Sequence, residues 1–275
     1  MIDWPAFSPF PSQFIGVSTF DAADTDRVRT YLNWSELLRQ WEIPVSFPEA
    51  LDSPDWNTTA RSLLADANAL LDGWIAGGLL RAEVTFGVWQ ARAEGDQVVV
   101  QPATGAAVRL TFPRLPLADG SSYCLADLIK PAALLTTAES DYIGGYAVRL
   151  DQRIGIAIQP WVAAEDDYRV FLANDLCALY RSAVADYLHY RLRRFIWAYC
   201  DDDDLSNTEI MEGLHQGIRV PVGNYACPGP VERSGLPELL GLANPLSAGC
   251  GFFFAHPRAR PFQPQPVYNS PVVNA

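Results

Sequence analysis

The longest helical stretch of this protein decides its fold: EDDYRVFLANDLCALYRSAVADYLHYRLRRFIWAYC, residues 165–200. Apolar side chains recur there at the three- and four-residue spacing of a helix, which predicts one amphipathic helix. Its continuous apolar stripe comprises Tyr168, Phe171, Leu172, Leu176, Leu179, Ala183, Tyr187, Leu188, Leu192, Phe195 and Tyr199. A stripe of this length needs an equally long apolar surface to cover it, and the rest of the chain must supply that surface.

The middle of the chain supplies strands. Residues 80–114 contain the short β-branched runs VTFGVWQA, VVVQP and AAVRLTF, separated by the turn-forming segments EGDQ and ATGA. DYIGGYAVRL at 141–150 is the clearest strand, and YCLADLIKP at 123–131 is expected to cover an end of the sheet. These patterns predict a sheet of short strands joined by tight turns.

Helical spacing also appears at Asp24–Trp41 and at Thr58–Trp74, and SNTE at 206–209 is a capping box for a helix that ends near Gly217. Helices first, strands in the middle and long helices later predict an α+β fold with an antiparallel sheet framed by long helices.

The chain divides into three expected parts. Residues 1–20 are interrupted by prolines and read as an N-terminal arm, and residues 263–275 belong to a proline-rich C-terminal tail. Residues 21–262 are expected to form a single domain, because 275 residues can fill one core in an α+β fold.

Composition excludes several classes of partner. The net charge is −12, which argues against nucleic acid and anionic membranes because both require clustered Lys and Arg. We find no secretory signal and no apolar window long enough to span a bilayer. The five cysteines are scattered without a C-x-x-C pair, which favours reduced thiols and a cytoplasmic protein.

Several motifs for catalysis are weak or missing. The aspartates at 201–204 could attract a cation, but they lack the alternating spacing of a calcium loop and fit a solvated linker better. His189, His215 and His256 are far apart in sequence, so a zinc site is weakly supported. We find no nucleophile elbow, phosphate loop or dinucleotide fingerprint.

The segment QGIRVPVGNYACPG at 216–229 is the best candidate for a binding site. It is too rich in proline and glycine for a helix and alternates too poorly for a strand buried on one face, so we expect an extended segment. Arg219 could bind a carboxylate, and the backbone near Pro221 could form hydrogen bonds with the edge of a planar ligand. Gly223 would allow a ligand to approach the backbone closely, and Tyr225 could stack on a base. The alternative is that Arg219 only packs an extended crossing segment.

Motifs along nearly the whole chain resemble one family. They are YLNW at 31–34, ADANALLD at 65–72, YCLADLIKP, DYIGGYAV, the long helix from residue 166, LSNTE, GIRVPVGNYACP and GFFFAHP at 251–257. In this order and spacing, they resemble the carboxy-terminal activation domain of cobalamin-dependent methionine synthase. The resemblance implies an α+β fold that binds S-adenosylmethionine and caps a cobalamin-bearing domain while inactive cobalt(II) is reduced and methylated.

The family's ligand signature, Arg-x-x-x-Gly-Tyr, places Arg219 on the ligand carboxylate and the chain near Pro221 on the adenine. Gly223 also matches the signature. The tyrosine position holds Asn224, and Tyr225 follows one residue later.

Other positions also depart from the family pattern. Where the family has an aspartate that meets the ligand's amino group, this chain has Asn33, which loses a charge-assisted bond of roughly 1.5–3 kcal/mol. A family tyrosine after the His-Pro pair falls on Pro261, with Phe262 adjacent, and the family's terminal helix is replaced by the proline-rich tail.

The resemblance therefore predicts a stand-alone reactivation module that binds S-adenosylmethionine and docks in trans onto a cobalamin-binding methionine synthase or a related corrinoid protein. Cobalamin would reach it only through that partner, and a flavodoxin-like protein is the expected reductant. The alternative is a non-catalytic docking module that has lost S-adenosylmethionine binding.

Overall fold

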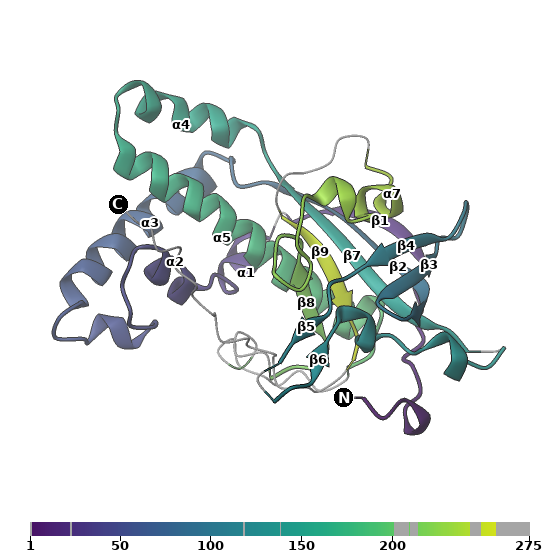
Figure 1. Ribbon diagram of the computed structural model, residues 1–275. Helices are drawn as coiled ribbons and strands as arrows, with labels where there is room; N and C mark the ends of the chain where they lie inside the picture. The colour runs from purple at the N-terminus through teal and green to yellow at the C-terminus, as the bar shows by residue number, and fades with distance from the viewer. Residues whose placement is uncertain are drawn as a thin grey trace, which may run out of the picture.

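The structure is a computed structural model that describes residues 2–22, 24–117, 119–137, 139–200, 209, 214–242 and 249–256 (Figure 1). Its strands are β1 Gly16–Asp21, β2 Ala82–Glu94, β3 Gln97–Gln101, β4 Val108–Thr111, β5 Leu115–Pro116, β6 Ser122–Tyr123, β7 Asp141–Leu150, β8 Ile218–Pro221 and β9 Cys250–Phe254. Its α-helices are α1 Thr25–Arg29, α2 Trp34–Gln40, α3 Asn57–Ala76, α4 Arg153–Ala163, α5 Asp167–Arg191 and α7 Leu236–Leu240. Short helical turns are η1 Trp4–Ala6, η2 Glu49–Leu51, η3 Leu125–Leu128, η4 Ala132–Leu134, η5 Leu192–Ile196 and η6 Val231–Arg233.

Seven of the described strands form one antiparallel sheet. Six of them follow the order β4-β3-β2-β7-β9-β8, and the seventh, β1, pairs with β2. The long strand β2 pairs along one edge with β1 and then β3, and along its other edge with β7. The strands predicted at 84–112 and at 141–150 are confirmed, and β7 has the predicted bounds. Mixed helices and an antiparallel sheet confirm the expected α+β class.

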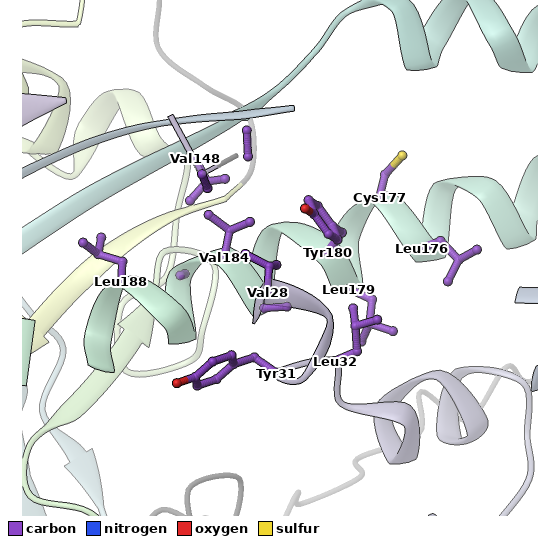
Figure 2. Close-up of a cluster of buried hydrophobic side chains, with 14 of the residues drawn as sticks. Val28, Tyr31, Leu32, Val148, Leu176, Cys177, Leu179, Tyr180, Val184 and Leu188 are labelled. Carbon is purple, nitrogen blue, oxygen red and sulfur yellow. The ribbon is translucent and has the colours of Figure 1, made fainter. Parts of the chain in front are cut away.

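Both faces of the sheet are covered. On one face, Val148 and Phe253 pack against α5 and the helices beyond it, as Figure 2 shows for Val148 and the α5 side chains. On the other face, Phe252 and Phe254 join Leu236 of α7 and Leu125 of η3 in a second cluster. Three successive phenylalanines are therefore all buried, because alternate side chains of a strand point to opposite faces.

The helix predicted at 165–200 is present as α5, but it is shorter than predicted. Most of its stripe is buried, including Leu192 and Tyr199 beyond the α-helix, whereas Phe171 and Phe195 are 62% exposed. The α-helix ends at Arg191, continues as the single wide turn η5, and stops where Ala198 adopts a φ of 59°. The predicted extension to residue 200 is wrong because the chain turns there.

The helix predicted at 24–41 is two helices. The Asp24 side chain caps α1 by accepting from the Arg27 N–H, and the Asn33 side chain caps α2 by accepting from the Glu36 N–H. Because a side chain that caps a helix start competes with continued helix, the second cap interrupts the apolar stripe. The predicted helix at 58–74 is confirmed as α3.

The described part of the expected N-terminal arm, residues 2–20, lies against the rest of the structure. Trp4 is buried, the Phe7 carbonyl accepts from Lys130 Nζ at 3.3 Å, and β1 pairs with β2.

The domain boundaries stay predictions. The tail at 263–275, the aspartates at 201–204 and most of the helix predicted from SNTE lie outside the described residues.

All five cysteines are buried thiols. Within the described ranges, no helix is long and apolar enough to cross a membrane.

The contact between β8 and β9 makes a pair of matched stability tests. Gly251 lies opposite Pro221, and a β-carbon at residue 251 would collide with the Val220 backbone oxygen and lie 2.7 Å from Tyr146 Oη. We expect Gly251→Ala to lower the free energy of unfolding by about 1–3 kcal/mol, because the two strands must separate. A β-carbon added at Gly155 in α4 would have no other atom within 4 Å. We therefore expect Gly155→Ala to raise the free energy of unfolding by about 0.5–1 kcal/mol. Urea denaturation measures both, and equal effects would contradict the strand contact.

Candidate functional site

A cavity of about 530 Å³ lies beside the edge strand β8 and is lined by residues of α5 and by Leu125 of η3, which pack on opposite faces of the sheet. One wall comes from the α1–α2 region, with Tyr31, Asn33, Glu36 and Gln40. The opposite wall comes from β8, the turn after it and the segment before η3. Helix α5 contributes further lining residues.

Helix α5 directs a polar row into this cavity. Ser182, Asp186 and His189 all line it. Their spacing of four and three residues places them on one side of the helix. The apolar stripe of α5 therefore runs beside a polar row, so one helix supplies both core contacts and cavity contacts.

Arg219 and Asp186 form a two-pronged ion pair between β8 and α5. Arg219 Nε and Nη2 donate to the two Asp186 carboxylate oxygens at 2.7 and 3.0 Å. Arg219 Nη2 also donates to Ser182 Oγ at 2.8 Å, and Nη1 donates to Tyr146 Oη at 3.1 Å. Burial alone would lower the pKa of Arg219. The contacts with Asp186 and Tyr146 outweigh that effect and raise the pKa above its ordinary value, so the guanidinium keeps its charge.

The backbone of β8 is open on the side away from β9. The Val222 N–H donates to the Cys250 carbonyl at 2.9 Å, so the residues whose backbone faces β9 are 218, 220 and 222. The N–H and carbonyl of Arg219 therefore point toward the open edge. Pro221 has no N–H, and its carbonyl accepts from the Asn224 N–H at 3.3 Å. The predicted extended segment is thus a short edge strand that leaves one donor and one acceptor beside the cavity.

A tight turn after β8 aims Tyr225 at the cavity. Gly223 has a φ of 95°, a conformation that glycine adopts without strain. Asn224 Oδ1 accepts from the Ala226 N–H at 3.0 Å, which bends the chain around residue 225. Asn224 and Tyr225 both line the cavity, and Tyr225 is 42% exposed.

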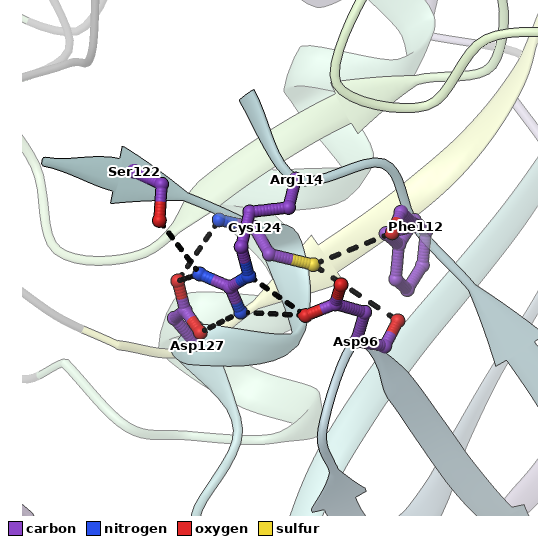
Figure 3. Close-up of polar contacts among 6 residues, drawn as sticks. All are labelled: Asp96, Phe112, Arg114, Ser122, Cys124 and Asp127. Atoms are coloured by element: carbon purple, nitrogen blue, oxygen red, sulfur yellow. Dashed lines mark hydrogen bonds and ion pairs between the residues drawn. The ribbon is translucent and has the colours of Figure 1, made fainter. Parts of the chain in front are cut away.

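The segment before η3 is fixed by one arginine (Figure 3). Arg114 donates from Nη2 to Asp127 Oδ1 and from Nε to Asp96 Oδ1, both at 2.8 Å. Asp127 in turn accepts from the Cys124 N–H at 2.9 Å. This network holds the backbone on either side of Cys124, where Tyr123 and Leu125 line the cavity.

His189 lies at the end of the polar row. Its Nε2 is 2.9 Å from Tyr199 Oη, and its ring stacks on Phe253 at 5.0 Å. The ring of His215, which is distant in sequence, meets it edge-on at 4.9 Å. Burial, with the nearby charges of His215, Arg193 and Arg219, lowers the pKa of His189 well below 6.5. The imidazole is therefore neutral at pH 7. No group of three possible metal ligands occurs in the described part of the chain.

The family model for the activation domain of vitamin B12-dependent methionine synthase matches residues 24–272. The chain belongs to this family. Among solved structures it is similar to the crystal structure of the MetH reactivation domain bound to AdoHcy, with 27% sequence identity and a TM-score of 0.81. That match covers 94% of this chain and 84% of the other. The resemblance seen in the sequence is confirmed.

The structure of this activation domain brings three of the expected site residues together, because Asn33, Arg219 and Tyr225 line one cavity. Pro221 and Gly223 shape the neighbouring turn and are exposed. Pro261 and Phe262 lie outside the described residues. The roles of these residues in ligand binding stay predictions.

Sequence reasoning missed several residues that line the cavity. Ser182, Asp186 and His189 left a signal, since they are polar positions at helical spacing beside an apolar stripe. Tyr123 and Glu36 left none, because only the folded chain brings their segments to the cavity.

The neutral state of His189 predicts how the stability of the activation domain depends on pH. Its folded pKa is below 6.5, so the unfolded chain binds the proton first and stability falls as the pH drops below about 6.5. One proton sets a limit of about 1.4 kcal/mol per pH unit. We expect His189→Gln to be less stable at pH 7.5 but to lose less stability between pH 7.5 and 5.5. Urea denaturation at three pH values measures this, and an unchanged slope in the variant would contradict it.

Proposed function

We propose that this activation domain binds S-adenosylmethionine in the cavity beside β8 and presents its methyl group to a cobalamin-binding domain during reductive methylation of inactive cob(II)alamin. Family membership and the AdoHcy-bound neighbour support the ligand class. The observation that carries the proposal is the position of Arg219, which places a permanent cation and an open backbone edge beside one cavity.

Each part of the ligand has a matching surface. The ligand carboxylate would accept from Arg219 Nη1, which has a second hydrogen beyond the one directed at Tyr146. The adenine edge would bond the backbone N–H and carbonyl of Arg219, and its face would stack on Tyr225. Binding at Nη1 leaves the ion pair with Asp186 intact, so no buried charge loses its partner.

The protein contributes binding and orientation rather than bond making. Cobalamin, held by the partner domain, would supply the methyl acceptor once an external electron donor such as flavodoxin has reduced it. The activation domain would hold the sulfonium donor in line with that acceptor and exclude water from the interface. After the methyl group leaves the sulfonium, S-adenosylhomocysteine remains in the cavity, which agrees with AdoHcy in the neighbouring structure. Pro261 and Phe262 are proposed to contact the ligand as well.

A docking module without methyl-donor binding is the second candidate. Two observations favour it: Asn33 carries no charge, and both carboxylate oxygens of Asp186 already occupy the fork of Arg219. The partner would be the same cobalamin-binding domain.

We also propose a cytoplasmic location, supported by the five buried thiols and by the acidic net charge of −12.

Arg219→Lys separates the two candidates. We expect the wild type to bind S-adenosylmethionine at micromolar concentration, and the variant to bind about 1.5–3 kcal/mol more weakly, which is ten- to hundredfold in Kd. Lysine keeps the charge but cannot serve Asp186 and a ligand carboxylate together. Titration calorimetry measures both, with Arg109→Lys on β4 as the matched control. No heat from the wild type at millimolar ligand would support the docking module instead.

Tyr225 tests the proposed adenine contact. We expect Tyr225→Ala to weaken binding of S-adenosylhomocysteine by about 1–3 kcal/mol, the usual range for a base stacked on an aromatic ring. Tyr225→Phe keeps the ring and should bind as the wild type does. Equal affinity of all three proteins would show that the tyrosine does not contact the base.

A further inference from the structure

Three charged side chains of fixed sign line the described part of the cavity: Glu36, Asp186 and Arg219. Arg219 and Asp186 neutralise each other through two short bonds. The nearby His189 adds no charge, because burial lowers its pKa well below 6.5. These three side chains together carry a net charge of −1, which a ligand with one excess positive charge would balance.

Glu36 is also the carboxylate that a ligand could engage most easily. Its two oxygens accept from Arg39 at 2.6 and 3.1 Å and from Gln40 at 3.2 Å. The Arg39 side chain is 64% exposed and that of Glu36 is 37% exposed, so this ion pair contributes little to stability. Asp186 differs, because its partner Arg219 is only 16% exposed and leaving that cation unpaired would be costly.

The position of Glu36 fits this role. Asn33 and Glu36 both line the cavity and stand three residues apart at the start of α2. Side chains with this spacing are neighbours on a helix surface. The Asn33 side chain is neutral, and its oxygen accepts from the Glu36 N–H at 3.3 Å. Glu36 is thus the charged acceptor on this wall.

We infer that Glu36 is a specificity residue of the cavity, whose carboxylate binds the ammonium of the ligand's amino-acid part while Arg219 binds its carboxylate. This rests on the proposed binding of S-adenosylmethionine. An ammonium has three donors and no acceptor, so it requires an anionic acceptor when it leaves water. On ligand binding, Glu36 exchanges its surface partner Arg39 for the ammonium.

The test is calorimetry of Glu36→Gln with two neutral-sulfur probes. S-adenosylhomocysteine carries the ammonium, and 5′-methylthioadenosine lacks the whole amino-acid part. We expect Glu36→Gln to bind S-adenosylhomocysteine about tenfold more weakly, the effect of losing one charge-assisted bond. Its affinity for 5′-methylthioadenosine should not change. The matched control is Glu42→Gln, which removes an exposed carboxylate just beyond α2 and should bind both probes as the wild type does.

A second variant tests the role rather than the residue. Asn33→Asp combined with Glu36→Gln returns a carboxylate to the same wall, and it should recover most of the lost affinity. Melting curves of both variants report whether they fold. Unchanged S-adenosylhomocysteine affinity in Glu36→Gln overturns the inference, and so does an equal loss for 5′-methylthioadenosine or a loss confined to S-adenosylmethionine. A wild type that binds none of these ligands overturns the proposed function itself, which is a different result.

Discussion

The ion pair between Arg219 and Asp186 is the constraint on which the site depends. It joins the edge strand β8 to the C-terminal part of α5 through two hydrogen bonds, and Ser182 Oγ and Tyr146 Oη also accept from the guanidinium. Since removing either partner would leave a poorly solvated charge, the edge strand and the helix must keep their relative positions. The cavity has a defined shape because this distance is fixed, and the cation stays charged because the carboxylate is there.

Much of the fold could be predicted from local patterns. The strand at 141–150 and the helix at 57–76 have strong periodicity and sharp ends, and both were predicted nearly to the residue. The helix predicted at 24–41 failed because two capping side chains, Asp24 and Asn33, interrupt a pattern that apolar spacing alone reads as continuous. The end of α5 was misplaced because the turn at Ala198 comes from tertiary packing around Trp197, whose indole donates to the Phe10 carbonyl.

The residues of the candidate site could be predicted only where they belong to a recognisable sequence motif. Arg219 and Tyr225 could be singled out because the signature lies in one continuous segment. Asp186 and His189 lie on a helix whose apolar stripe dominates its pattern, and the proximity of His189 to His215 depends on how the chain returns to the sheet. Sequence distance made these two histidines look unrelated. The periodicity of apolar residues predicts single helices and strands, but it does not predict which of them come into contact. In this protein those contacts form the cavity.

Two of the departures from the family pattern, Asn224 and Asn33, have different consequences because their local backbones differ. Asn224 lies in a turn, where a side-chain bond to the Ala226 N–H bends the chain and lets the next residue, Tyr225, line the cavity. Asn33 caps a helix, so the directions of the residues after it are set by helical geometry. The carboxylate on this wall of the cavity belongs to Glu36, one helical turn after Asn33.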